Sequence, residues 1–294
     1  MKILIVGASG LVGSNCLKHF KAQGWDVRGT YFSYAQPGLE YFNTLQPDDA
    51  ANFDVAAFAP QVIVHCGALT HVDYCESHED ESYTQTVQST KNLVALAHEC
   101  GARMVYLSTD YVFDGDAGPY RENALVNPLS VYGRHKLIAE LAVLEGVTHA
   151  LVLRVTNIYG DEARGKNFVA RIVQQCLEGA KLTLKLPYDQ YASPTNAMDI
   201  ARAMFVLLRD DHHGIYHIGS TDYMNRVALA LNILKHFPDA QYELIPLDTE
   251  TLDQPAERPL LGGFITTKFN LAYPEFRFST LDDYLAGMLP AIAK

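Results

Sequence analysis

The sequence predicts an α/β fold, a doubly wound parallel β-sheet with a small C-terminal lobe. Three observations support this prediction. Short apolar runs rich in β-branched residues alternate with longer segments of helical periodicity, which is the pattern of strand–helix–strand units. Several of the short runs are apolar throughout, as expected for strands that helices cover on both faces. A glycine-rich turn at residues 7–13 joins the first run to the first helical segment.

The first half of the chain alternates regularly between the two kinds of segment. The expected strands cover residues 2–6, 26–32, 61–66, 103–108 and 149–155. The expected helices cover residues 11–23, roughly 82–100, and 131–144. In the second of these helices, Leu93, Val94, Leu96 and Ala97 form one apolar stripe, and Gly101 ends the pattern.

The pattern loosens after about residue 155, where prolines divide the chain into shorter pieces. Helical patterns remain at residues 167–177, 195–208 and 227–237, and a short strand is expected at residues 214–219. We therefore expect one unit over residues 1–294, with a nucleotide-binding core at approximately 1–155. Residues from approximately 156 to 294 are expected to form mainly a substrate lobe, with some elements returning to the core.

The composition is that of an ordinary globular protein, with 48% hydrophobic and 19% charged residues. The formal net charge of -11 argues against a nucleic acid or an anionic membrane as partner. The five cysteines are widely spaced and include no C-x-x-C pair, so neither a disulfide framework nor a metal site is expected, and the cytoplasm is the expected location. The apolar run at residues 1–6 is too short for a signal peptide, and no apolar stretch approaches the roughly 20 residues of a membrane span.

The glycine-rich turn follows the first expected strand and leads into the first expected helix. Glycine allows a tight turn and a close approach of the backbone to a ligand, and the helix N-terminus offers free N–H groups to a pyrophosphate. The spacing is G-x-x-G-x-x-G, and the alternative is a glycine-rich turn without a ligand. The strand before it and the helix after it favour a dinucleotide site on a Rossmann-type sheet. The residues expected to contact the cofactor here are Gly7, Ser9, Gly10, Leu11, Val12 and Gly13.

The form of the cofactor depends on the end of the second expected strand. An acidic residue there would bind the ribose 2′-hydroxyl of NAD, but residues 27–36 contain none. Arg28, Thr30 and Ser33 are available instead, and an arginine or a hydroxyl group suits a 2′-phosphate. The sequence therefore favours NADP(H), with NAD(H) as the alternative. A solvated Arg28 on the strand's surface is the other interpretation of that residue.

Tyr132 and Lys136 are spaced i to i+4 in the expected helix 131–144, so their side chains lie on one helix face. A tyrosine titrates near pH 10, and a neighbouring ammonium group stabilises its phenolate. We therefore expect Lys136 to lower the pKa of Tyr132 toward neutrality, so that the pair can exchange a proton with a substrate. The same spacing also occurs in ordinary surface helices. Its position downstream of a dinucleotide loop favours the catalytic interpretation.

Residues 108–115, "STDYVFDG", follow a buried strand but carry hydroxyl, carboxyl and aromatic groups. In an open parallel sheet, ligands bind beyond the carboxyl ends of the strands, so this segment is expected to face the cleft. Thr109 is expected to hydrogen-bond a reacting carbonyl or alcohol, while Tyr111, Val112 and Phe113 are expected to wall the pocket. The alternative is that the hydroxyl groups only cap the next turn.

Seven segments occur in the order found in extended short-chain dehydrogenases: "GASGLVG", "VIVHCGALTHVDYCE", "YLSTDYVFDG", "NPLSVYGRHKLIAE", "LRVTNIYG", "DQYASPTNAMDIA" and "GIYHIG". Within that superfamily the chain resembles the dTDP-4-dehydrorhamnose reductase family, most specifically in "STDYVFDG" and the "DQ…PT" pattern. The resemblance covers most of the chain to about residue 220. It implies a single extended unit that reduces the 4-keto group of a nucleotide-linked 6-deoxysugar with NAD(P)H, as in dTDP-rhamnose biosynthesis.

The resemblance also assigns residues to roles. It implies that Thr109, Tyr132 and Lys136 are catalytic. It also implies that Tyr132 and Lys136 contact the cofactor and that Ala68 and Thr70 lie along it. The residues implied to contact the substrate are Val72, Asp110, Tyr111, Val112, Phe113, Asn157, Gln190 and Arg258.

Departures from the family pattern leave the sugar open. Asn157 stands where these reductases often carry tryptophan, and the polar residues expected after Arg258 are missing. One alternative is a sugar-nucleotide epimerase on the same fold. A dehydratase is disfavoured, because Asp110 is followed by Tyr111 and not by glutamate. Another alternative is a non-catalytic, nucleotide-binding regulatory subunit such as that of methionine adenosyltransferase, although the Thr–Tyr–Lys set argues against it. The sequence leaves open whether the chain forms a homodimer.

Overall fold

A computed structural model describes residues 1–292. Its centre is a parallel sheet with the strand order β11-β6-β5-β4-β1-β2-β3. The strands are β1 (Lys2–Val6), β2 (Asp26–Tyr31), β3 (Glu40–Tyr41), β4 (Val62–His65), β5 (Arg103–Thr109), β6 (Leu151–Val155) and β11 (Gly214–His217). The order reverses between β1 and β4, and a crevice for a ligand opens at such a switch point. The predicted doubly wound α/β fold is confirmed.

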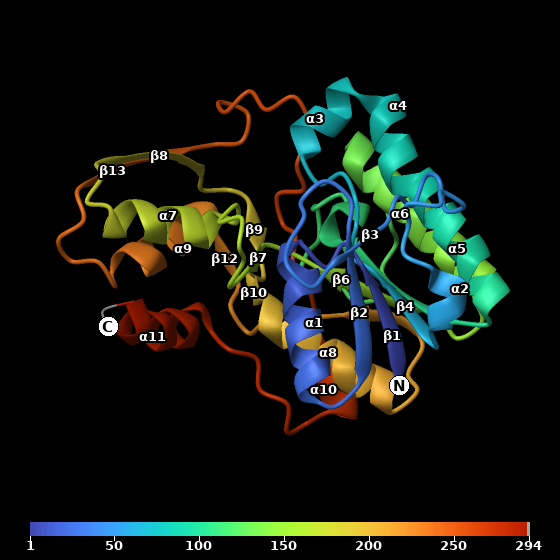
Figure 1. The fold of residues 1–294 in the computed structure, drawn as a ribbon. Helices are drawn as coiled ribbons and strands as arrows, with labels where there is room; N and C mark the ends of the chain where they lie inside the picture. Colours follow the sequence, from blue (N-terminus) through green and yellow to red (C-terminus); the bar gives the residue numbers. More distant parts are fainter. Residues whose placement is uncertain (293–294) are drawn as a thin grey trace.

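Helices cover both faces of this sheet (Figure 1). One face packs on α1 (Leu11–Ala22) and α8 (Ala197–Arg209), and the other packs on α5 (Ser89–Cys100) and α6 (Val131–Gly146). Successive residues of a strand point to opposite faces, so Ile3 of β1 joins the first core cluster and Leu4 joins the second. Both faces therefore need apolar residues, which explains why the strands read as continuous apolar runs.

The segment before α5 is more broken than the sequence suggests. The helix expected at residues 82–100 consists of α4 (Glu79–Ser82), a π-helical stretch (Tyr83–Gln88) and α5. Shorter pieces elsewhere in this half are α2 (Val55–Phe58), α3 (Val72–Ser77) and a 3₁₀ turn (Asp110–Val112).

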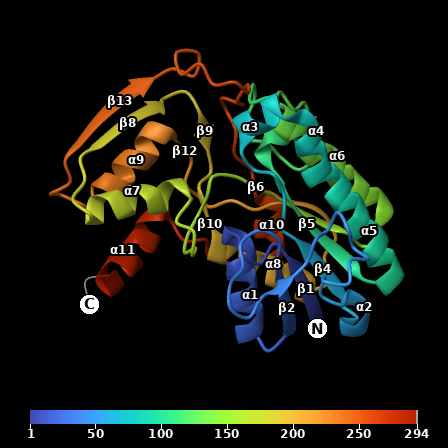
Figure 2. The ribbon, with the colours of Figure 1, turned by 45° about the horizontal axis from the view of Figure 1, so that its top comes forward.

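A smaller lobe lies beside the carboxyl ends of the strands (Figures 1 and 2). It contains α7 (Phe168–Leu177), α9 (Arg226–Leu234), α11 (Leu281–Ile292) and the parallel pair β8 (Leu182–Pro187) and β13 (Tyr242–Leu247). Two-residue ladders join β7 (Ile158–Tyr159) to β10 (Thr195–Asn196) and β9 (Tyr191–Ala192) to β12 (Met224–Asn225). The lobe has an apolar core of its own, built mainly from α7, α9 and α11.

The two parts of the chain are interleaved. The elements α8 and β11 come after α7 and β8 in sequence, yet β11 is a strand of the main sheet and α8 packs on it. Helix α10 (Thr267–Ala272) packs beside β11. The longer elements that the sequence analysis did not anticipate include β8, β13, α10 and α11. Within residues 1–292, no helix is long and apolar enough to cross a membrane.

Candidate active site

The glycine loop after β1 is built so tightly that only glycine fits. Gly7 has a φ of +84°, and a Cβ atom there would lie 2.9 Å from the backbone nitrogen of Gly67. A Cβ atom on Gly13 would lie 2.3 Å from the carbonyl oxygen of Gly7. The loop therefore brings β1, α1 and the end of β4 into backbone contact at the edge of a cavity.

This cavity, which we call the nucleotide cavity, has a volume of about 640 Å³. Helix α1 starts at its wall with Gly10 as the N-cap residue and without any side-chain cap, so the first N–H groups of the helix are left for a ligand. Ten residues expected to contact the cofactor line it: Gly7, Ser9, Gly10, Leu11, Val12, Gly13, Thr30, Ser33, Ala68 and Thr70.

Arg28 lies elsewhere, which corrects the expectation that it contacts the cofactor. It is exposed on β2 between the buried residues Val27 and Gly29, and it does not line the nucleotide cavity. Arg28 and Thr30 lie on the same face of β2, but only the end of the strand, from Thr30 onward, reaches the cavity.

The cations of the nucleotide cavity come from residues 161–167, a loop between β7 and α7. Arg164 and Lys166 both line the cavity, and the Arg164 guanidinium lies 5.2 Å from the centre of the Tyr34 ring, just past the end of β2. The neighbouring Glu162 carboxylate accepts hydrogen bonds from the backbone and side-chain nitrogens of Asn167, at 2.6 and 2.9 Å. The Glu162 carboxylate is thus held by hydrogen bonds within the loop.

A second cavity of about 390 Å³, the catalytic cavity, adjoins the first. Five residues line both cavities: Cys66, Ala68, Thr70, Leu107 and Ile158. Thr109, Tyr132 and Lys136 all line the catalytic cavity, so the three residues expected to be catalytic come together. Thr109 is the last residue of β5, and the other two lie one turn apart on α6.

Two local contacts fix the start of α6 and therefore the position of Tyr132. The Ser130 hydroxyl caps the helix by accepting a hydrogen bond from the Gly133 N–H at 3.2 Å, and the Val131 N–H donates to the Glu76 carboxylate at 2.9 Å. The Tyr132 ring meets the Tyr111 ring edge to face, with 5.5 Å between the ring centres.

The protonation of the Tyr132–Lys136 pair differs from the expectation. Burial raises the pKa of Tyr132 above its ordinary value, and the nearby Thr109 hydroxyl offsets only part of that rise. The expectation that Lys136 lowers the pKa of Tyr132 is wrong in this structure, because the ammonium group turns to other partners. It donates to the Leu107 carbonyl at 2.5 Å and lies 4.2 Å from the centre of the Tyr106 ring.

Lys136 is itself perturbed. Its residue is only 4% exposed, and burial lowers its pKa to about 7. A lysine of this kind can lose and regain a proton near neutral pH, whereas an exposed lysine stays charged.

Asp110, which was expected to contact the substrate, lines the catalytic cavity but is already engaged. Its carboxylate accepts hydrogen bonds from the Thr156 hydroxyl at 2.6 Å and from the Gly263 N–H at 3.3 Å. Burial raises the pKa of this carboxyl group. Asp110 therefore fastens the C-terminal segment around Gly263 to the end of β5.

The remaining residues expected to contact the substrate fall into two groups. Val72, Tyr111 and Asn157 line the catalytic cavity. Arg258 does not, but its guanidinium lies 6.0 Å from the centre of the Tyr111 ring and forms an ion pair with Asp73 at 2.8 Å.

Three expected contacts need correction. Val112 and Phe113 are fully buried in a separate apolar cluster with Tyr120 and Phe264, so they support the cavity from behind and do not wall it. A 3₁₀ turn at Asp110–Val112 precedes Phe113, and the side chains of Val112 and Phe113 point into the protein interior. The Gln190 amide donates to Thr249 and Gln254, at 3.0 and 3.2 Å, and lines neither cavity.

Comparison with known proteins places this site in a family. The sequence model of the RmlD substrate binding domain matches residues 1–280. The chain belongs to this family. A methionine adenosyltransferase 2 subunit beta from Xenopus laevis is 34% identical over 254 residues, which are 85% of this chain and 76% of that protein.

Solved structures agree with the RmlD assignment. A dTDP-4-dehydrorhamnose reductase from Clostridium acetobutylicum has a TM-score of 0.82 and 29% identity, over 98% of this chain and 100% of the other. The NADP complex of a dTDP-4-dehydrorhamnose reductase from Bacillus anthracis has a TM-score of 0.84 over 99% of both chains, at 24% identity, which shows the shared fold. The family resemblance in the sequence is thus confirmed.

The RmlD-family site also contains residues that the sequence analysis missed. Arg226 of α9, Thr156 and Phe168 line the catalytic cavity, and Arg164 and Lys166 line the nucleotide cavity. No local motif marks these residues. Thr156 directly follows β6, whereas the other four reach the cleft only because the small lobe folds back over the carboxyl ends of the strands.

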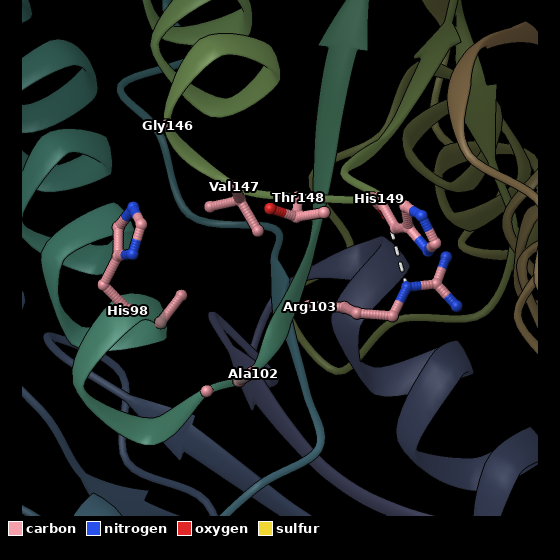
Figure 3. Close-up of a pocket in the computed structure, with 9 residues that line it drawn as sticks. His98, Ala102, Arg103, Gly146, Val147, Thr148 and His149 are labelled. Carbon is pink, nitrogen blue, oxygen red and sulfur yellow. Dashed lines mark hydrogen bonds between the residues drawn. The ribbon is translucent and has the colours of Figure 1, made fainter.

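A third cavity, of about 300 Å³, lies at the amino ends of β5 and β6, where α5 and α6 end (Figure 3). Its most polar residue, Arg103, is already bound to the carbonyl oxygens of His149 and His212 and to Asp211. None of the expected site residues lines it. Within the described residues, no group of three or more His, Cys, Asp or Glu side chains could hold a metal ion.

Proposed function

We propose that this RmlD-family protein reduces the 4-keto group of a nucleotide-linked deoxysugar with NAD(P)H, in the manner of dTDP-4-dehydrorhamnose reductases. One observation carries the proposal: Thr109, Tyr132 and Lys136 line a cavity that shares five lining residues with the nucleotide cavity. Reduction of a carbonyl needs a hydride donor and a proton donor on the same substrate, and this arrangement provides a place for each.

The residues of the nucleotide cavity fit a nicotinamide dinucleotide. The uncapped N-terminus of α1 suits a pyrophosphate, and the glycine positions leave room for it where a Cβ atom would not fit. When bound, the coenzyme would supply the hydride. The relatives crystallised with NADP support a coenzyme of this class for the present chain.

The protein's own residues would manage the proton. With a raised pKa, Tyr132 stays protonated at neutral pH, so its hydroxyl can donate a proton to the carbonyl oxygen of the substrate. The Thr109 hydroxyl orients that oxygen. Lys136, with a pKa of about 7, can return a proton to the phenolate that remains.

NADP(H) is the coenzyme we propose, because Arg164 lies near the end of β2 and residues 27–36 contain no acidic side chain. Arg164 over the Tyr34 ring is placed to contact a 2′-phosphate, with Ser33 in the same cavity wall. We propose the cytoplasm as the location, since all five cysteines are free thiols.

The experiment is a panel of nucleotide-linked 4-keto sugars mixed with the purified protein and NADPH or NADH. A reductase consumes the reduced coenzyme in proportion to the sugar alcohol that it forms. An epimerase would change the sugar without net loss of coenzyme. Absence of any coenzyme oxidation or sugar conversion across the panel would reject the proposal.

A regulatory subunit is the second candidate function, favoured by the 34% identity to a methionine adenosyltransferase subunit beta. Such a protein would bind the nucleotide without turning it over. Copurification with a methionine adenosyltransferase catalytic subunit, together with no conversion of any keto-sugar, would favour this candidate over the reductase.

A further inference from the structure

Arg226 is a cation of the catalytic cavity without a carboxylate partner. It is the first residue of α9 and is partly buried. Its Nη2 donates to the Asn157 side-chain oxygen at 2.6 Å, and its guanidinium lies 5.3 Å from the centre of the Phe168 ring. In the described part of the chain, no carboxylate oxygen lies within 4.0 Å of its guanidinium nitrogens. Its other donors therefore remain available on the cavity side.

Within residues 1–292, no nearby carboxylate forms a hydrogen bond with Arg226. Asp110 is the carboxylate that acts on it most strongly, but that carboxylate already accepts hydrogen bonds from Thr156 and Gly263. Arg258 also acts on Tyr111, but Asp73 binds its Nη2. Apart from the bond to Asn157, the Arg226 guanidinium thus has no hydrogen-bond acceptor among the described residues.

Asn157 holds the arginine in place. Its backbone has a φ of 42°, in the left-handed region that asparagine tolerates better than most residues. This conformation points the amide oxygen at Arg226. Burying part of a guanidinium costs free energy unless an anion or hydrogen-bond acceptors compensate it. A protein that holds such a group at a cavity wall has a site for an oxyanion.

We infer that Arg226, positioned by Asn157, binds an oxyanion of the substrate, a carboxylate or a phosphate, in the same cavity as the Tyr132 hydroxyl. The inference rests on the proposed function for the presence of a nucleotide sugar in this cavity. It adds that the substrate carries its negative charge close to the reacting carbonyl. Arg226 then selects against neutral substrates of similar shape.

The test is calorimetric titration of the full chain, saturated with NADPH, with UDP, UDP-glucose and UDP-glucuronate. The variants are Arg226→Met, Arg226→Lys and, as a matched control, Arg171→Met. Arg171 is an exposed cation on α7 that acts on Arg226 through space but does not line the cavity. Thermal unfolding and NADPH affinity establish that each variant is folded.

We expect Arg226→Met to lose about 10- to 100-fold in affinity, Arg226→Lys to lose less, and Arg171→Met to match the wild type. Equal losses for all three nucleotides assign the diphosphate as the bound group. A loss confined to UDP-glucuronate assigns a carboxylate on the sugar. Unchanged affinity of Arg226→Met for every probe, or an equal loss in Arg171→Met, overturns the inference.

Failure of the proposed function gives a different result. In that case the wild-type protein oxidises no coenzyme with the panel of keto-sugars, whether or not it binds the three nucleotides. Inorganic pyrophosphate, titrated into the same variants, then decides the inference. Weaker pyrophosphate binding in Arg226→Met than in Arg171→Met supports the oxyanion site, and equal binding rejects it.

Discussion

The Lys136 ammonium group donates a hydrogen bond to the carbonyl oxygen of Leu107, at 2.5 Å, across the floor of the catalytic cavity. The contact ties α6 to the end of β5. The amine is buried at this position, and the burial lowers the pKa of Lys136 to about 7. The site thus gains a proton carrier at the expense of stability at low pH.

Replacing Lys136 with methionine should change how stability depends on pH. The pKa of Lys136 is about 7 in the folded protein, against an ordinary value of 10.5. Below pH 7 the lysine is therefore protonated in both the folded and the unfolded protein, and the folded protein bears the full cost of burying the charged amine. Between these values the unfolded chain binds a proton that the folded protein has released, so this group's cost falls as the pH rises. Lys136→Met should therefore be more stable than the wild type at pH 6, and the difference should shrink toward pH 10.

Urea unfolding at several pH values measures this difference. Lys91→Met, which removes an exposed lysine of α5, serves as the control and should give no such trend. A constant difference between Lys136→Met and the wild type would contradict the burial of a titrating amine.

Replacing Tyr132 with phenylalanine should remove the proton donor and little else. Turnover should fall by about 10²- to 10⁴-fold, the usual contribution of general acid catalysis. NADPH affinity should be nearly unchanged, because the nucleotide cavity does not include Tyr132. Stopped-flow rates and fluorescence titration measure the two effects, with Tyr188→Phe, an exposed tyrosine, as control. Turnover that survives the substitution would place the proton donor elsewhere.

Replacing Arg164 with alanine should weaken NADPH binding by about 10-fold and leave NADH binding almost unchanged, since one charge-assisted contact to the 2′-phosphate is lost. Arg28→Ala is the matched control, because Arg28 is exposed on β2 and outside the cavity. Dissociation constants for both coenzymes test the assignment. Selective loss of NADPH binding in Arg28→Ala, and not in Arg164→Ala, would assign the 2′-phosphate contact to Arg28.

Replacing Glu140 with glutamine should destabilise the protein by about 3–5 kcal/mol, because it leaves the Arg154 guanidinium buried without its counter-charge. Glu140 and Arg154 form a two-pronged pair at 2.5 and 3.1 Å, with side chains that are 0% and 3% exposed. Lys235→Met breaks the exposed pair with Asp282 and should cost no more than about 1 kcal/mol. Chemical unfolding compares the two, and similar small losses would show that the buried pair contributes little.

The features that the sequence predicted well are local in the chain. The glycine loop, the Tyr132–Lys136 spacing and Thr109 at a strand end each occupy a few consecutive residues, so a periodicity or a spacing reveals them. The parallel sheet is visible for the same reason, because each strand carries its own apolar run. Most of the residues that these features predict to contact the cofactor or to be catalytic line the two adjoining cavities.

The features that the sequence missed depend on contacts between distant segments. Arg164 and Arg226 reach the cleft only when the small lobe folds over it, and nothing in their neighbours signals this. Val112 was expected to wall the pocket, but a single 3₁₀ turn reverses the direction of its side chain. The raised pKa of Tyr132 follows from its burial, which a spacing cannot reveal.

The return of α8 and β11 to the main sheet makes this chain indivisible. A fragment ending near residue 155 would lack the edge strand beside β6 and the helix that packs on α1, and it would expose the apolar surface that they cover. The complementary fragment would carry Arg226 without a cleft to place it in. Neither half could therefore be transplanted as a module, because each would leave apolar surface of the shared core uncovered.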